Sequence, residues 1–260
     1  MSKTVECKMH CSVNEMLLGG IPLNSAVSSN NANKKKHGHL VYDFIKITGL
    51  PSMALWLRPK VIRVGENTKI DGGYMVFANH CSFIDPLLIH CVFFKRRVHS
   101  LVTKDFYATS FKRLICKHML CIQVDKDNFS VDSFHDVVRL LKAGKVVSIF
   151  PEGQVNHNPE NMLTFKSGVV LMAYTAGKPI LPVYLLPPEK WYSRRVAVIG
   201  EPINVKELCG KRPSTADFDN ISKYLHDTEE DLKRYYLENF GNAKKDIESN
   251  LENKKEEAVK

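Results

Sequence analysis

Short apolar runs, separated by segments of helical periodicity, make up most of the chain between residues 61 and 200. The runs lack the alternation of polar and apolar positions that a half-exposed strand shows, which favours strands buried on both faces of a sheet. We expect strands at residues 61–64, 74–78, 98–102, 122–124, 146–150, 180–185 and 196–199. Strands that alternate with helices predict an α/β fold, with a mixed, largely parallel sheet flanked by helices.

The segments between these runs carry apolar residues three and four positions apart, as amphipathic helices do. We expect a helix beginning near Phe83 and further helices over residues 110–119, 132–143 and 166–176. Gly144 and Gly177 directly follow the last two helices and are predicted to cap them.

These patterns divide the chain into four parts. We expect a disordered leader over residues 1–39, an amphipathic membrane-interface segment over 40–60, a single domain over 61–218 and a charged helical tail over 219–260. The leader is rich in Ser and Asn, a composition that buries too little apolar surface to offset the entropy of ordering. The apolar stripe of the tail ends near Phe240.

The segment from Leu40 to Leu57 is the nearest candidate for a membrane span. Asp43, Lys46 and the Gly49–Pro51 turn interrupt it, so it falls short of the roughly 18 uninterrupted apolar residues that a span requires. Its pattern predicts two short amphipathic pieces on either side of the turn. They either lie in a membrane interface, with Trp56 at headgroup depth, or cover the core of the domain.

Length, charge and cysteine content narrow the class of protein. A chain of 260 residues with 44% apolar composition suits one large domain. Of its net charge of +9, residues 1–200 carry 26 Lys and Arg against 14 Asp and Glu, which attracts nucleic acid, an anionic membrane or a phosphorylated substrate. No nucleic-acid-binding motif accompanies the charge, so we expect no nucleic-acid partner. Seven cysteines without metal-binding spacing, and no apolar run at the start of the chain, predict a reducing, cytosolic setting and no metal.

A histidine at the end of a predicted strand carries the strongest chemical signal. His80 follows Asn79, and Asp85 comes five residues later in the turn that leads into a helix. A carboxylate that holds an imidazole in one tautomer lets its other nitrogen accept a proton from a substrate hydroxyl. The same two residues also suit a purely structural role, because helix N-termini favour Asp.

A second segment favours the catalytic interpretation. Phe150–Gly153 ends a predicted buried strand, so it places a carboxylate and a glycine in a loop at a sheet edge, where α/β proteins bind ligands. The two segments in this order, followed by Pro179–Val183, resemble the NHxSxxD, FPEG and VPV-like motifs of the lysophospholipid and glycerol-phosphate acyltransferase family. The resemblance runs from about Val61 to Leu186. It implies an acyltransferase domain that moves an acyl group directly from acyl-CoA or acyl carrier protein to a glycerol hydroxyl, with no other cofactor and no metal.

The resemblance also implies a role for each matching residue. His80 would deprotonate the acceptor hydroxyl, and Asp85 would orient His80. The residues expected to bind the substrate are Asn79, Ser82, Lys126, Glu152, Gly153 and Lys166, and Lys104 is a further candidate. We expect Ser82 to cap the following helix rather than act as a nucleophile.

Two departures from the family pattern concern the phosphate. Lys126 replaces an arginine of a GxIxVDR-like segment, and Val155 stands where the FPEGTR motif has its arginine. A lysine neutralises phosphate as a point charge but lacks the planar two-bond clamp of a guanidinium. The expected reaction is conversion of 1-acylglycerol-3-phosphate to phosphatidate by a membrane-associated protein on the cytoplasmic face. The alternatives are another lysophospholipid acceptor and a non-catalytic, lipid-binding relative.

Overall fold

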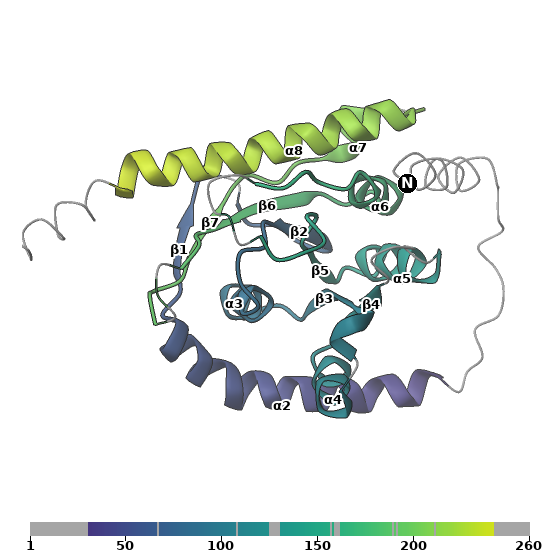
Figure 1. Ribbon diagram of the computed structural model, residues 1–260. Helices are drawn as coiled ribbons and strands as arrows, with labels where there is room; N and C mark the ends of the chain where they lie inside the picture. Colours follow the sequence, from purple (N-terminus) through teal and green to yellow (C-terminus); the bar gives the residue numbers. More distant parts are fainter. Residues whose placement is uncertain are drawn as a thin grey trace, which may run out of the picture.

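One sheet dominates the computed structural model (Figure 1). The structure describes residues 31–66, 68–107, 109–124, 131–156, 158, 162–188, 190, 192–210 and 212–241. In these ranges the strands are β1 (Lys60–Arg63), β2 (Tyr74–Ala78), β3 (Val98–Thr103), β4 (Ile122–Val124), β5 (Val146–Ile149), β6 (Ile180–Leu185) and β7 (Val196–Ile199). They form a seven-stranded sheet in the order β1-β7-β6-β2-β5-β3-β4. All neighbours are parallel except β6 and β7, which confirms the predicted mixed, largely parallel sheet.

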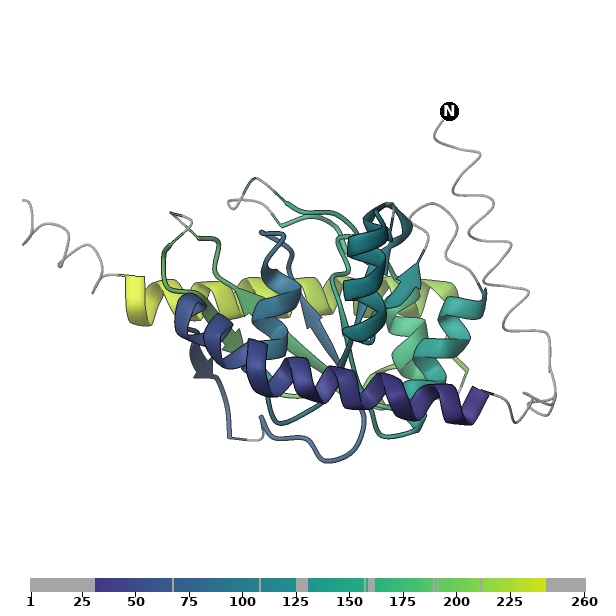
Figure 2. The same ribbon diagram turned by 90° about the horizontal axis from the view of Figure 1, so that it is seen from below.

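Helices cover both faces of the sheet. They are α2 (Asn31–Leu57), α3 (Asp85–Val92), α4 (Ser110–His118), α5 (Val131–Lys142), α6 (Gly168–Ala176), α7 (Val205–Cys209) and α8 (Thr215–Tyr236). A 3₁₀ helix (Lys104–Tyr107) follows β3, and a π-helical turn (Leu237–Gly241) follows α8. Figures 1 and 2 place α8 and α2 on opposite sides of the sheet. Gly177 ends α6 in the left-handed conformation, as its position predicted.

Strand β2 shows why the sequence of the sheet lacks polar alternation. Its five residues are all buried. Met75 and Phe77 pack with side chains of α5, α6 and α8, whereas Val76 and Ala78 pack with side chains of α2 and α3. Because both faces contact helices, every position of the strand has to be apolar.

Helix α2 departs from the sequence-based prediction. It begins at Asn31, inside the segment expected to be disordered, and runs without a break through the Gly49–Pro51 segment, where a turn was expected. A proline inside a helix costs about 3 kcal/mol because it removes a backbone hydrogen bond. Burial of Tyr42, Leu50 and Leu57 against the domain offsets this cost. The prediction of two separate pieces was therefore wrong.

Helix α8 is part of the domain rather than a separate tail. The predicted boundary at residue 218 falls inside it, because a capping box between Ser214 and Asp217 starts the helix earlier. Its side chains Phe218, Leu225 and Leu232 are buried, the first two in the core above β2 and β5. The part of the expected tail beyond residue 241 lies outside the described residues.

The strand order brings three carboxyl ends together. In register, Phe77 of β2 lies beside Ile149 of β5, and Ala78 lies beside Val183 of β6. The helix that follows β2 packs on one face of the sheet, and the helix that follows β5 packs on the other. Connections that diverge in this way leave a crevice at the carboxyl edge, where open α/β sheets bind ligands.

Candidate active site

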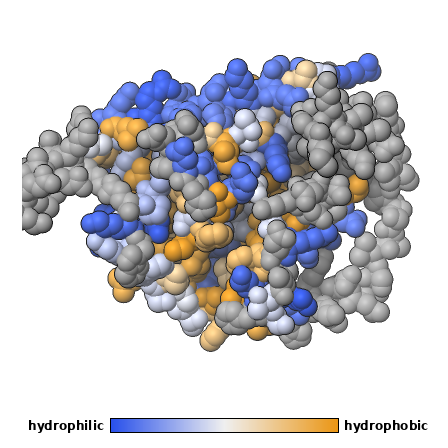
Figure 3. All heavy atoms as spheres, viewed as in Figure 1, coloured by the Kyte–Doolittle hydropathy of each residue, from blue (hydrophilic) through white to orange (hydrophobic). Residues whose placement is uncertain are grey.

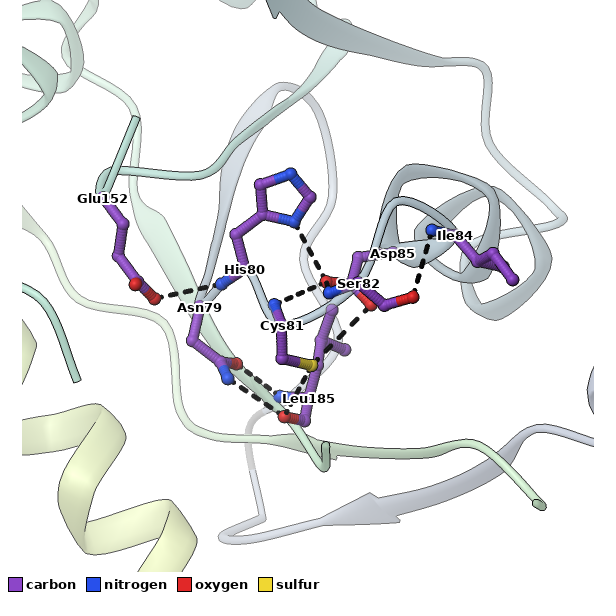
Figure 4. Close-up of polar contacts among 8 residues, drawn as sticks. All are labelled: Asn79, His80, Cys81, Ser82, Ile84, Asp85, Glu152 and Leu185. Carbon is purple, nitrogen blue, oxygen red and sulfur yellow. Dashed lines mark hydrogen bonds and ion pairs between the residues drawn. The ribbon is translucent and has the colours of Figure 1, made fainter. Parts of the chain in front are cut away.

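His80 lies in this crevice, two residues after β2, and its ring is hydrogen bonded to the first residue of α3. The distance from His80 Nδ1 to Asp85 Oδ2 is 3.0 Å (Figure 4). A carboxylate only accepts hydrogen bonds, so Nδ1 carries the proton and Nε2 presents its lone pair. Figure 4 shows the second ring nitrogen on the side of the ring away from Asp85. The His80 side chain keeps 15% of its surface exposed, whereas that of Asp85 keeps 3%.

The buried carboxylate of Asp85 is held by backbone donors as well. Its Oδ2 accepts hydrogen bonds from the amides of Cys81 and Ser82, each at 2.7 Å. Asp85 N in turn donates to Ser82 O at 3.0 Å. The five-residue spacing between His80 and Asp85 therefore forms a closed turn that fixes the carboxylate relative to the imidazole.

The loop after β5 supports the same histidine from the other side. The ring of Phe150 stacks on that of His80, with centroids 4.3 Å apart and planes inclined by 22°. The sequence analysis assigned Phe150 no role. This contact restricts rotation of the imidazole, so the orientation of the ring is fixed by packing against Phe150 as well as by the hydrogen bond to Asp85.

Glu152 contacts the backbone of His80, a role that the sequence did not predict. Its Oε1 accepts a hydrogen bond from His80 N at 3.0 Å, and Asn156 N donates to His80 O at 2.6 Å. Burial raises the pKa of Glu152, and the backbone hydrogen bonds from His80 and Leu163 partly oppose that effect. The FPEG loop thus clamps both backbone groups of the histidine.

Asn79 also has a structural role that the sequence did not predict. Its Nδ2 donates to Leu185 O at 3.0 Å, and its Oδ1 accepts from Leu185 N at 2.6 Å. The amide is buried, and both of its polar atoms join β2 to the end of β6. Asn79 therefore fixes the end of β2 and with it the backbone position of His80.

The two residues after His80 shape the turn. Ser82 Oγ accepts a hydrogen bond from Ile84 N at 3.4 Å, within the turn. Helix α3 has Ile84 as its N-cap and no side-chain cap, so the predicted capping role of Ser82 was wrong. Cys81 Sγ lies 3.8 Å from both Asp85 Oδ1 and Leu185 O. Burial, and then the charge of Asp85, raise the pKa of the Cys81 thiol, so it stays protonated and is a poor nucleophile.

The predicted phosphate-binding residues are only partly brought together. Gly153 has φ of +70°, and a β-carbon there would lie 3.2 Å from Lys166 Nζ, so this lysine sits directly beside the FPEG turn. Lys104 is exposed in the 3₁₀ helix after β3, which is two strands away from β2. Lys126 lies outside the described residues.

The sequence analysis missed two charged residues near the site. Arg195 is 4% exposed, and its positive charge lowers the pKa of the Cys81 thiol against the larger effect of burial. Glu229 of α8 is completely buried, and the charge of Glu152 acts on it. Neither residue belongs to a motif, and the sequence around each is typical of an exposed charged residue.

A buried histidine elsewhere has a different environment. His90 Nδ1 lies 3.2 Å from Tyr42 Oη, and its Nε2 lies 3.2 Å from Ser100 Oγ. Burial lowers the pKa of His90 to about 4, so it is neutral at physiological pH. It joins α2, α3 and β3 within the core.

A histidine oriented by a carboxylate, at the carboxyl edge of an α/β sheet, has the geometry of a general base. The sequence profile of the family described as "Acyltransferase" matches residues 60–186, a range that contains His80, Asp85 and the FPEG loop. This region belongs to the acyltransferase family, and the protein is an O-acyltransferase.

Individual relatives agree with this family. The chain is 23% identical over 149 residues to a 1-acyl-sn-glycerol-3-phosphate acyltransferase of Bacillus subtilis, which covers 55% of this chain and 73% of the relative. It is 27% identical over 161 residues to the protein of that name from Borreliella burgdorferi, covering 59% of this chain and 62% of the relative. The crystal structure of a 1-acyl-sn-glycerophosphate acyltransferase from Thermotoga maritima has the same fold, with a TM-score of 0.56, 20% identity and 88% of each chain covered.

Proposed function

We propose that this protein transfers a fatty acyl group from acyl-CoA or acyl carrier protein to the free hydroxyl of 1-acylglycerol-3-phosphate, which yields phosphatidate. The hydrogen bond between His80 Nδ1 and Asp85 Oδ2 carries the proposal, because it prepares Nε2 to accept a proton. The names of the relatives from Bacillus subtilis and Borreliella burgdorferi support this acceptor.

The proposed reaction needs no covalent enzyme intermediate. His80 Nε2 takes the proton of the acceptor hydroxyl while its oxygen attacks the thioester carbonyl, and Asp85 stabilises the imidazolium that forms. When the tetrahedral intermediate collapses, the carbon–sulfur bond breaks and the imidazolium protonates the departing thiolate. The products are an ester and a free thiol, and His80 returns to its starting state without a metal or a further cofactor.

Two cations near the dyad support an anionic acceptor. Lys166 lies beside the Gly153 turn, and the charge of Arg195 reaches Cys81, the residue next to the catalytic histidine. Val155 supplies no charge at the family's arginine position. We therefore propose that Lys166 and Arg195 share the neutralisation of the acceptor phosphate.

A matrix of acceptors and donors tests the proposed function. Purified protein is mixed with lysophosphatidate, lysophosphatidylcholine or glycerol 3-phosphate, each with acyl-CoA and with acyl carrier protein loaded with the same chain. We expect phosphatidate formation from lysophosphatidate to exceed acylation of lysophosphatidylcholine by about tenfold or more, since choline masks the phosphate and a charge-assisted phosphate contact contributes about 1.5–3 kcal/mol. Glycerol 3-phosphate keeps the phosphate but lacks the apolar acyl chain, so it should react more slowly as well. Equal rates of acylation of lysophosphatidate and lysophosphatidylcholine would contradict the proposed acceptor. If no combination of acceptor and donor consumed the thioester, the proposed catalysis would be contradicted.

The exposed face of α2 supports membrane association. Leu40, Phe44 and Ile47 are each at least 66% exposed and recur at helical spacing, and Leu55 is 80% exposed near the end of the helix. Figure 3 shows apolar residues at the surface along the side where α2 runs, whereas the side covered by α8 is mostly hydrophilic. We propose that this stripe lies in the interface of a membrane, on its cytoplasmic face, where acyl thioesters occur.

By length and composition alone, Leu40–Leu57 also passes as a membrane span. Polar contacts favour the interface instead. Arg97 Nε donates to Asp43 Oδ1 at 2.9 Å, and Lys46 Nζ donates to Arg96 O at 3.0 Å. These bonds hold α2 along the domain, so only its outer side meets the lipid.

A triple variant with serine in place of Leu40, Phe44 and Ile47 should bind anionic liposomes at least about tenfold more weakly. The reason is that burying each such apolar side chain contributes up to about 1.5–3 kcal/mol. Sedimentation with liposomes measures the bound fraction. Leu208→Ser is the matched control, because this residue is 52% exposed on α7, on the other face of the sheet. Turnover of short-chain soluble substrates should persist in the triple variant, and unchanged sedimentation would remove the interface proposal.

A further inference from the structure

Glu229 is a carboxyl group inside the core. It belongs to α8 and is 0% exposed, on the helix face that also buries Leu225 and Leu232. Within the described part of the chain, neither of its carboxyl oxygens makes a hydrogen bond of normal geometry, although the backbone amide of Asn79 lies near enough to lower its pKa. A buried carboxylate without partners is strongly unfavourable, so the group takes up a proton or finds a donor.

The surroundings of Glu229 keep it neutral. Burial, and then the negative charge of Glu152, raise its pKa well above the ordinary value, and the charge of Glu230 adds to this. The backbone of Asn79 lowers the pKa, but less than burial raises it. Tyr184 of β6 also faces it, and burial raises the pKa of that phenol, so Tyr184 contributes no charge. Glu229 is therefore a protonated acid that can donate one hydrogen bond.

Glu152 offers an acceptor for that proton. One carboxyl oxygen, Oε1, holds the amide of His80 at 3.0 Å. The backbone of Leu163 and the side chain of Asn156 lie near enough to lower the pKa of Glu152. The other oxygen, Oε2, is nevertheless buried and makes no hydrogen bond of normal geometry among the described residues. Two ionised carboxylates side by side would repel, whereas one proton between them satisfies an oxygen of each.

We propose that protonated Glu229 donates a hydrogen bond to Glu152 Oε2, and that the C-terminal helix thereby positions the loop of His80. This inference rests on the proposed function, which makes His80 the general base. Glu229 touches neither His80 nor the substrate in this scheme. It is a positioning residue: the hydrogen bond keeps Glu152 in place, and Glu152 keeps the backbone amide of His80 in place.

The proton shared by Glu229 and Glu152 affects the rate of acyl transfer through the placement of the His80 imidazole. The imidazole has to present Nε2 to the hydroxyl within hydrogen-bonding distance, and small misplacement of a catalytic group costs up to about a hundredfold in rate. If the shared proton is lost at alkaline pH, the two carboxylates repel and Glu152 loosens its hold on the amide. Activity should therefore fall on the alkaline side as the pair ionises.

Three variants test the proposal by activity. Glu229→Leu removes the donor and should lower kcat about tenfold or more with little change in the KM for the acyl thioester. Glu229→Gln keeps a donor that cannot ionise, so it should restore most of kcat and move the alkaline limb of the pH profile to higher pH. Glu238→Gln, an exposed glutamate of the turn that follows α8, is the matched control and should behave as wild type.

A measurement without substrate separates this inference from the proposed function. The backbone ¹H–¹⁵N resonance of His80 should shift with pH as the carboxyl pair titrates, and Glu229→Gln should move that titration, whether or not any acceptor is acylated. Thermal unfolding shows whether Glu229→Leu folds. A His80 amide titration unchanged in Glu229→Gln, or a wild-type kcat in folded Glu229→Leu, would overturn the proposal.

Discussion

Alanine at His80 is expected to lower kcat by about three to four orders of magnitude, the upper range of a general-base contribution. The histidine ring is the group that accepts the hydroxyl proton, and Asp85 is too deeply buried to replace it. The variant should remain folded, because the ring leaves 15% of its surface exposed and the Asp85 turn keeps its two backbone hydrogen bonds. Steady-state kinetics at saturating lysophosphatidate measures the loss.

Two comparisons sharpen this result. His135→Ala removes an exposed histidine from α5 and should keep wild-type kinetics. Added imidazole should restore part of the activity of His80→Ala, because the vacated space beside Phe150 opens toward the crevice. Undiminished product formation by His80→Ala would eliminate general-base catalysis by this residue. The non-catalytic, lipid-binding alternative would instead be favoured if the wild-type protein formed no product.

Asparagine at Asp85 should have an effect of similar size for a different reason. One carboxyl oxygen, Oδ2, accepts the hydrogen bonds of His80 Nδ1 and of two backbone amides. An amide carries no charge and has one accepting oxygen. With that oxygen at the place of Oδ2 the imidazolium loses its stabilising charge, and with the NH₂ group there His80 faces a donor and takes the wrong tautomer. The analogous change in a serine protease triad lowers kcat about 10⁴-fold. We expect a loss of about 10³-fold to 10⁴-fold here.

Asp85→Asn should also destabilise the fold, because hydrogen bonds to a charged group contribute about 1.5–3 kcal/mol each. Urea unfolding measures this effect separately from kcat. Asp132→Asn is the matched control, since Asp132 is an exposed acidic residue in the first turn of α5. The double variant with His80→Ala should be hardly less active than His80→Ala alone, because the two residues act as one unit. Additive losses, or wild-type kcat in Asp85→Asn, would contradict the dyad.

Glu152 and Asn79 illustrate how a motif can be recognised in a sequence while the contacts of its residues are not. Glu152 was expected to hold the acceptor, yet it holds the amide of His80. Asn79 was expected to contact the substrate, yet it joins β2 to β6. A motif records which residues occur together, whereas only the coordinates show whether a side chain points into the crevice or behind it.

The local chemistry of the chain determined the sheet and the dyad. Strands such as β2 and β6 follow the predicted bounds because buried, two-sided strands require continuous apolar runs, a short-range property that sequence displays. The link from His80 to Asp85 is equally local, since the three hydrogen bonds that Asp85 Oδ2 accepts lie within six consecutive residues.

Tertiary structure alone decided the features that depend on distant partners. Helix α2 continues through Pro51 because Leu50 and Leu57 are buried against the sheet, which outweighs the local preference for a turn. Glu229 lies nearly eighty residues beyond Glu152 in a highly charged helix, and only the packing of α8 turns it inward. The sequence by itself therefore determined that His80 and Asp85 form a pair, and the fold decided which buried groups hold that pair in position.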